Sequence, residues 1–351
     1  MHEIFLPPFK RHGELQPIQA MASGESTEYQ WDKVMMDAHK AHEAGFDGTG
    51  VKIGILDTGK RKADHPDLLV SEVKAARSFV PNETVDDGNG HGTAVHSCIS
   101  AKHNGIGMAG TAPGAEIYIA KVLGNNGGGS LDSLIKGTEW LLSQGCNIIN
   151  GSLGFGTATI LRNYDNVLRK GVDSGVAFVF ASGNGGKDNE IDFPSSSNRC
   201  FGVGAINARG EVASFSNKSL DVDVVAPGVN IMVVSHLHNG YLGMSGTSFS
   251  SPNTAGMLGC FFQWYKAKKG KFPTYEEAYY EITKFHVDDL GTKGLDPKYG
   301  YGLIRPKLVV ESSPVPEDPC PQLGLDDAKK VVEDSIDSKI LKAIYHLITN
   351  G

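Results

Sequence analysis

The stretch VKIGILDTG, residues 51–59, is rich in apolar and β-branched residues and ends in an aspartate followed by a turn. Segments 130–144 and 159–174 have the pattern of helices that follow such strands. Alternating strands and helices predict an α/β fold, with a largely parallel sheet covered by helices on both faces. Functional residues are then expected at the carboxyl ends of strands. Further strands are expected over EIYIAKVL (116–123), NIIN (147–150), VAFVFA (176–181), FGVGAI (201–206) and DVDVVA (221–226).

Composition and charge exclude several classes of function. The 351 residues include 33 Lys and Arg against 40 Asp and Glu, with no basic block, which argues against nucleic acid and membrane surfaces as partners. The N-terminus lacks a basic start followed by an apolar run, so no secretory signal is expected. The five cysteines are widely spaced and form no CxxC pair. Together these features predict a reduced, cytoplasmic protein.

Three short motifs supply the residue types of a nucleophilic triad. Asp57 lies in GILDTG, His91 in DDGNGHGTAVHS and Ser248 in GTSFSSP. A serine hydroxyl attacks a carbonyl only with a base, an orienting carboxylate and an oxyanion donor nearby. Each motif alone has an ordinary structural explanation, since aspartates cap turns and Gly-His-Gly occurs in loops. The order Asp, His, Ser is that of the subtilisin triad.

From about residue 26 to about residue 310 the chain resembles the subtilisin-like serine peptidases, and most of all the intracellular subtilisins. KVLGNNGGG, NGSLGF, ASGNGG and VAPG also follow in family order. The resemblance implies a subtilisin-like fold and a serine endopeptidase with Ser248 as nucleophile, His91 as general base and Asp57 as its orienting carboxylate. Asn184 would donate to the oxyanion together with the Ser248 N–H. Pro252 is expected inside the first turn of the helix that Ser248 opens, where a missing N–H costs little.

The resemblance also implies where an extended peptide substrate binds. The stretches NNGGG (125–129) and SLG (152–154) would flank the peptide as neighbouring strands, because glycines allow close backbone approach. Asn89 matches a family asparagine at the leaving-group side of the cleft, although a loop turn explains it equally well. The candidate substrate-binding residues are Asn89, Gly127, Gly129, Ser152, Leu153 and Gly154.

A structural calcium ion is implied as cofactor. Asp67 in HPDL and Asn104 in KHNGIGMAG match the side-chain ligands of the tight calcium site of the family. The carbonyls of Lys102, Ile106 and Met108 would complete an oxygen shell that suits a hard cation. The alternative is that both stretches are turns that close without a metal.

Both ends of the chain lie outside the catalytic domain expected over residues 26–310. In the extension 1–25, EIFLPPF (3–9) is similar to the short motif with which intracellular subtilisins block their own clefts, although its proline is doubled here. A proline near the reacting bond has no N–H to donate to an added strand. The alternative is an apolar tail on the surface. A Pro-rich linker is expected over 311–321, and an amphipathic helix over 322–351 that packs on its own domain or forms a homodimer contact.

Three functions follow from these motifs. The filled triad positions favour an endopeptidase that acts on proteins or peptides. A related peptide transferase or cyclase would pass the acyl group to an amine instead of water. A non-catalytic module would bind peptides without cleaving them.

Overall fold

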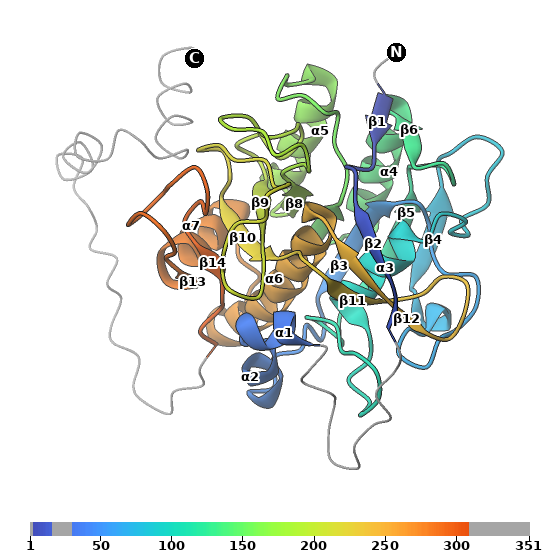
Figure 1. The fold of residues 1–351 in the computed structure, drawn as a ribbon, viewed down its shortest axis with the longest axis horizontal. Helices are drawn as coiled ribbons and strands as arrows, with labels where there is room; N and C mark the ends of the chain where they lie inside the picture. Colours follow the sequence, from blue (N-terminus) through green and yellow to red (C-terminus); the bar gives the residue numbers. More distant parts are fainter. Residues whose placement is uncertain (1–2, 16–29, 309–351) are drawn as a thin grey trace. The chain divides into compact units, whose positions relative to one another are not determined.

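The computed structural model describes residues 3–15 and 30–308 (Figure 1). Its main sheet has the strand order β13–β14–β10–β9–β8–β7–β3–β5–β4, and its neighbouring strands are parallel except for β13 with β14. The predicted α/β class with a largely parallel sheet is therefore confirmed. The strands are β3 (Lys52–Asp57), β4 (Ala75–Ser78), β5 (Glu116–Lys121), β7 (Ile148–Gly151), β8 (Ala177–Ala181), β9 (Phe201–Ile206), β10 (Val224–Pro227), β13 (Val287–Asp288) and β14 (Leu303–Ile304).

Helices cover both faces of this sheet because successive strand side chains point to opposite sides. Ile53 and Ile55 of β3 belong to one core cluster with residues of α3 (His91–Ser100) and α6 (Thr247–Lys269). Leu56 belongs to a second cluster with residues of α4 (Leu131–Ser143) and α5 (Arg162–Asp173). The two helices expected over 130–144 and 159–174 are α4 and α5, each slightly shorter than predicted. The remaining helices are α1 (Trp31–Met35), α2 (Ala38–Glu43), η1 (Val70–Glu72) and α7 (Tyr275–Phe285).

The segment 3–15 adds strands to two smaller sheets at the edge of the fold (Figure 1). β1 (Glu3–Phe5) pairs antiparallel with β6 (Gly128–Ser130). β2 (Lys10–Leu15) pairs antiparallel with β12 (Tyr241–Ser245), which also pairs with β11 (Ile231–Val234). The N-terminal segment is thus held by backbone hydrogen bonds at both of its ends.

One helix departs from the expectation. Pro252 is the sixth residue of α6 and not part of its first turn, so the predicted position was wrong. Proline cannot donate to the carbonyl four residues earlier, which belongs to Ser248. The Ser152 hydroxyl donates to that carbonyl instead, at 2.9 Å. A side chain from the loop after β7 therefore satisfies the carbonyl that Pro252 leaves unpaired.

Several predictions concern parts of the chain beyond these residues. The linker 311–321 and the helix 322–351 lie outside the described residues, and the domain boundaries stay predictions. None of the helices in the described part is long and apolar enough to span a bilayer. Four of the cysteines, Cys98, Cys146, Cys200 and Cys260, are buried.

Candidate active site

Asp57 and His91 meet at the carboxyl end of the sheet. Asp57 is the last residue of β3, and His91 is the first residue of α3. The Nδ1 of His91 lies 2.8 Å from Oδ1 and 3.0 Å from Oδ2 of Asp57, and both side chains are fully buried. The Thr58 N–H donates to the same carboxylate at 2.7 Å. The carboxylate therefore fixes the ring so that its other nitrogen, Nε2, is free for proton transfer.

A second aspartate, which the motif analysis did not single out, holds the start of α3. The Asp87 Oδ1 accepts hydrogen bonds from Gly90 N at 2.7 Å and Thr58 Oγ1 at 2.8 Å. Its Oδ2 accepts from Thr93 N and Thr93 Oγ1 at 2.8 and 2.7 Å. Asp87 thus satisfies donors of the first turn and ties them to the loop after β3. An aspartate four residues before the histidine was the available sequence signal.

Ser248 lies at the start of α6, among the first unpaired N–H groups of the helix. Its Oγ is buried, and its hydrogen bond goes to the Ser152 carbonyl at 3.5 Å. Within the described residues His91 Nε2 makes no hydrogen bond, so no direct bond joins it to the Ser248 hydroxyl. The ring of Phe249, the residue after Ser248, lies 5.9 Å from the His91 ring, measured between centroids. The other serines of this stretch differ: Ser251 donates to Asn150 Oδ1 at 2.6 Å, and Ser245 bonds to His12 Nε2 at 2.6 Å.

The Asn184 amide faces a peptide carbonyl. Its Oδ1 accepts from Thr247 N at 2.9 Å and Thr247 Oγ1 at 2.8 Å. These bonds leave Nδ2 directed at the cleft, where it donates to the Pro8 carbonyl at 2.8 Å. A backbone carbonyl from the N-terminal segment therefore occupies the position expected for the carbonyl of a substrate.

The rest of that segment lies along the two predicted edges. Phe5 exchanges backbone hydrogen bonds with Gly154, at 3.0 Å from its N–H and 3.2 Å to its carbonyl. Leu6 N donates to the Gly127 carbonyl at 3.2 Å, and Ile4 stands opposite Gly129. Gly127 has φ +83°, a conformation that a larger residue would adopt only with strain. The glycine-rich stretches thus hold an extended peptide between them.

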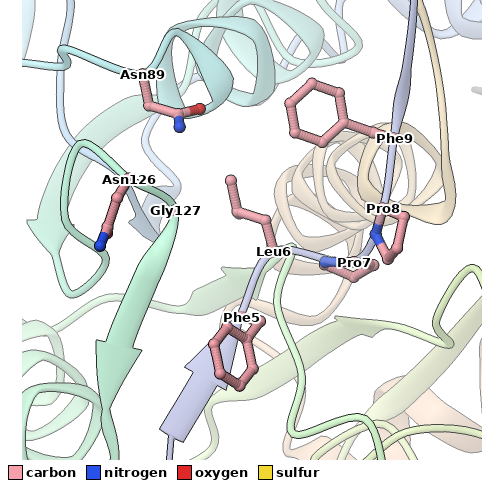
Figure 2. A pocket seen from close by; sticks show the side chains of 8 residues that line it. All are labelled: Phe5, Leu6, Pro7, Pro8, Phe9, Asn89, Asn126 and Gly127. Atoms are coloured by element: carbon pink, nitrogen blue, oxygen red, sulfur yellow. The ribbon is translucent and has the colours of Figure 1, made fainter.

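Figure 2 shows the segment beside Asn89, Asn126 and Gly127. Leu6 points toward Asn89 and Gly127, and Phe5 points away from them. The Phe9 ring lies 5.1 Å from the His91 ring, measured between centroids, and packs edge-on against Phe249. The apolar ring of Phe9 therefore lies against the imidazole, as part of the apolar cover that leaves it fully buried.

The remaining substrate-binding candidates lie close to the segment but differ in role. Asn89 lines the same pocket, where its Nδ2 donates to the Asn125 carbonyl at 3.1 Å and its carbonyl accepts from Arg11 at 2.9 Å. Ser152 contacts Ser248 through both its hydroxyl and its carbonyl. The Leu153 side chain is fully buried in the second core cluster, so it contributes packing at this position.

The calcium candidates form one cluster around Asp67, which is fully buried. Asp67 Oδ2 accepts from Tyr241 OH at 2.5 Å and Met108 N at 2.8 Å. The Asn104 amide lies 3.3 Å from Oδ1, and Ile106 N donates to the Asn104 side chain. Burial raises the pKa of Asp67, although these hydrogen bonds oppose the shift. No group of three or more His, Cys, Asp or Glu that could hold a metal occurs in the described part of the chain.

Comparison with known proteins agrees with this geometry. The Subtilase family matches residues 48–302. The chain belongs to the subtilase family. It is 39% identical to subtilisin Savinase from Lederbergia lenta over 277 residues, which cover 78% of this chain and 96% of that protein. It is 36% identical over 284 residues to the minor extracellular protease Epr from Bacillus subtilis (strain 168), covering 81% of this chain and 42% of that protein. This subtilase is a serine endopeptidase that acts on proteins or peptides.

Proposed function

We propose that Asp57, His91 and Ser248 form the catalytic triad of this subtilase and that Asn184 stabilises the oxyanion. The observation that carries the proposal is the bond from Asn184 Nδ2 to a peptide carbonyl, beside a histidine already oriented by an aspartate. In this reaction His91 accepts the Ser248 proton, the hydroxyl oxygen attacks the carbonyl, and the histidine returns the proton to the leaving amine. Water then hydrolyses the acyl-enzyme by the same steps.

A serine-directed phosphonate probe tests the assignment of the nucleophile. Wild-type protein should be labelled at Ser248, and Ser248→Ala should lose both labelling and peptide hydrolysis while keeping its fold. Labelling at Ser245 or Ser251, or full activity of Ser248→Ala, would show that the wrong serine was chosen. Mass spectrometry of the products separates an endopeptidase, which uses water, from a transferase or cyclase, which uses an amine. Absence of both labelling and cleavage would favour a peptide-binding module.

The same site is proposed to be latent, with residues 3–9 acting as a built-in inhibitor. The pairing of Phe5 with Gly154 and of Leu6 with Gly127 supports this proposal, as does the burial of His91 under Phe9. Pro7 and Pro8 have no N–H to add to the pairing, so a proline-containing segment binds as a strand but differs from a normal substrate at the reacting position. Cleavage of this segment or its release would open the cleft.

A structural calcium ion is proposed at the cluster around Asp67. Asp67 is a buried carboxylate that forms no ion pair within the described residues, and such a group is stabilised by a bound cation. The Asn104 side chain lies next to it, so the two side-chain candidates fit one site. The carbonyls of Lys102, Ile106 and Met108 would be the remaining ligands. When bound, the ion would tie the loop 102–108 to the rest of the domain. Cytoplasmic location and a dimer contact stay predictions.

A further inference from the structure

A buried lysine joins three loops of the site. Lys121 is the last residue of β5, stands opposite Asp57 of β3 and is fully buried. Its Nζ donates to the Thr58 carbonyl and to Asn125 Oδ1, the latter at 2.9 Å, and forms an ion pair with Glu83 at 3.1 Å. Glu83 also accepts from Asn125 N at 3.0 Å. A neutral amine has only two N–H groups for these three contacts, so the lysine is an ammonium.

Each partner of the ammonium belongs to a different loop. Thr58 directly follows the aspartate of the proposed triad, and Glu83 lies in the loop that leads to α3. Asn125 lies in the loop that leads to the substrate edge, residues 127–129. A buried ammonium that lost its partners would be costly, because neither water nor another charge would replace them. The buried charge therefore holds the three loops together.

Asn125 connects the buried ammonium to the residues before His91. Its Oδ1, which accepts from the ammonium, also accepts from Gly88 N at 3.0 Å, and its carbonyl accepts from Asn89 Nδ2 at 3.1 Å. The Asn89 Oδ1 accepts in turn from His91 N at 3.3 Å. The start of α3 and the substrate edge are thus joined through one residue, and the ammonium holds the side chain of that residue.

Lys121 does not itself touch the proposed triad. Within the described residues its Nζ makes no hydrogen bond to Asp57, His91 or Ser248. The carboxylate of Asp57 orients the His91 ring and accepts from the Thr58 N–H, while the ammonium binds the carbonyl of the same Thr58. The lysine therefore acts on the reacting groups only through the loops that it joins.

We propose that Lys121 is a positioning residue that keeps the substrate edge 127–129 in register with the triad. An extended peptide pairs with this edge while its reacting carbonyl lies at Asn184 and Ser248. A shift of the edge would therefore displace the carbonyl from the nucleophile, and a displacement of about 1 Å can cost roughly a hundredfold in rate. This inference rests on the proposed function, because it assumes that Ser248 attacks the carbonyl held by Asn184.

The test compares a long and a short peptide that share the residues beside the scissile bond. The long peptide spans the positions of residues 4–8 of the bound segment, and the short one only those of Pro7 and Pro8. The full chain is assayed after it has reached its highest activity, and the phosphonate probe counts the active sites. Lys121→Met should lower the long-to-short ratio of kcat/KM by roughly tenfold, as expected for lost hydrogen bonds to a charged group. The loss should appear mainly in kcat, because the edge still binds the peptide.

Two further variants make the test specific. Lys136→Met is the matched control, because Lys136 is an exposed lysine of α4 that pairs with Asp132 at 2.7 Å, and it should keep the wild-type ratio. Asn125→Ala removes the acceptor that Lys121 and Gly88 share, at an exposed position outside the core. It should lower the ratio by about fivefold, and it decides the matter if Lys121→Met does not fold. The two losses should be less than additive in the double variant, because both remove the same bond.

The inference and the proposed function fail in different ways. An unchanged ratio in Lys121→Met, together with labelling of Ser248, would overturn only the positioning role, and a lower melting temperature with that ratio would show that the lysine merely supports the fold. Equal losses for both peptides, or no advantage of the long peptide in wild type, would also overturn it. Absence of cleavage of every peptide by wild type, with no labelling of Ser248, would overturn both.

Discussion

Two hydrogen bonds hold the side-chain oxygen of Asn184, and they fix the direction in which its amide nitrogen can donate. Because Thr247 donates to Oδ1 through both its N–H and its hydroxyl, the amide has only one orientation that satisfies these bonds. Its N–H group is thus directed in advance at the carbonyl position. A donor fixed before the reaction stabilises the developing oxyanion without a cost of reorganisation.

Replacing Asn184 with Leu should therefore lower kcat by about 10²–10³-fold, the range known for this donor in subtilisin, and change KM little. The reason is that the hydrogen bond is strongest in the transition state. Steady-state kinetics on a peptide substrate provide the measurement. Asn166→Leu, the same change at an exposed position of α5, is the control. A loss that appears only in KM would place Asn184 outside the oxyanion site.

Sequence reasoning found the candidate residues that lie in short motifs and missed those defined by tertiary contacts. Asp57, His91, Ser248 and Asn184 each stand in a recognisable local pattern, so their positions could be predicted. Nothing around Asp67 in the sequence indicates that Tyr241 donates to it, because that contact exists only after two distant segments fold together.

At the scale of elements, the strands β1 and β2 attach the N-terminal segment to two smaller sheets. A three-residue strand such as β1 is stable only because β6 and Gly154 pair with it on either side. Six strands of the main sheet were predicted from the sequence, since they are short buried apolar runs, whereas β4, β13 and β14 were not predicted. The partners of β1 and β2 were not, because the pairing joins residues more than a hundred positions apart and leaves no local pattern.

The full chain should be nearly inactive, and a chain that begins at Ser26 should be active at once. The tethered segment competes at an effective concentration in the millimolar range, so even weak binding would exclude an external peptide. Hydrolysis of a peptide substrate by the two forms gives the measurement, with Ser248→Ala as the inactive control. Equal rates from untrimmed and trimmed protein would contradict the latency proposal.

Activation of the full chain should be intermolecular. On the latency proposal the segment presents no cleavable bond to its own Ser248, so another molecule must cut the chain, and the lag should shorten as enzyme concentration rises. Progress curves of peptide hydrolysis at several enzyme concentrations measure this lag. A lag of constant length would contradict intermolecular activation.

At the scale of the whole molecule, the calcium proposal makes stability depend on the free metal concentration. A ligand that binds only the folded state stabilises it by about 2.7 kcal/mol at a hundred times its dissociation constant. A chelator should therefore lower the melting temperature of wild type, and added calcium should restore it. Asp67→Ala should melt lower and respond to neither. Identical melting with and without chelator in wild type would show that no calcium is bound.

The folded state should also lose stability as the pH falls toward 4. Burial lowers the pKa of His286 to about 4, and nearby lysines add to the shift. The unfolded chain binds this proton near pH 6.5, so below that pH protonation favours unfolding, by up to about 3 kcal/mol. His286 accepts from Lys307 N at 3.1 Å and packs against Phe261, a geometry that needs the neutral ring.

Chemical unfolding between pH 7 and 4 measures this dependence. The slope of unfolding free energy against pH should be smaller in His286→Gln than in wild type. His39→Gln, the same change at a half-buried histidine of α2, serves as the control. An unchanged slope in His286→Gln would assign the acid sensitivity to other groups.

The hydrogen bond between Asn184 and the Pro8 carbonyl couples two properties, the catalytic rate and the inhibition of the full chain, that evolution would otherwise adjust separately. On the proposed function, one N–H group both accelerates the reaction and keeps the cleft closed. A substitution that weakens this donor would give an enzyme with residual activity before activation and a lower kcat after it. Stronger inhibition by the N-terminal segment must therefore come from other contacts, for instance the pairing of β2 with β12. On the latency proposal, substitutions in residues 10–15 would change the resting activity of this enzyme without changing its chemistry.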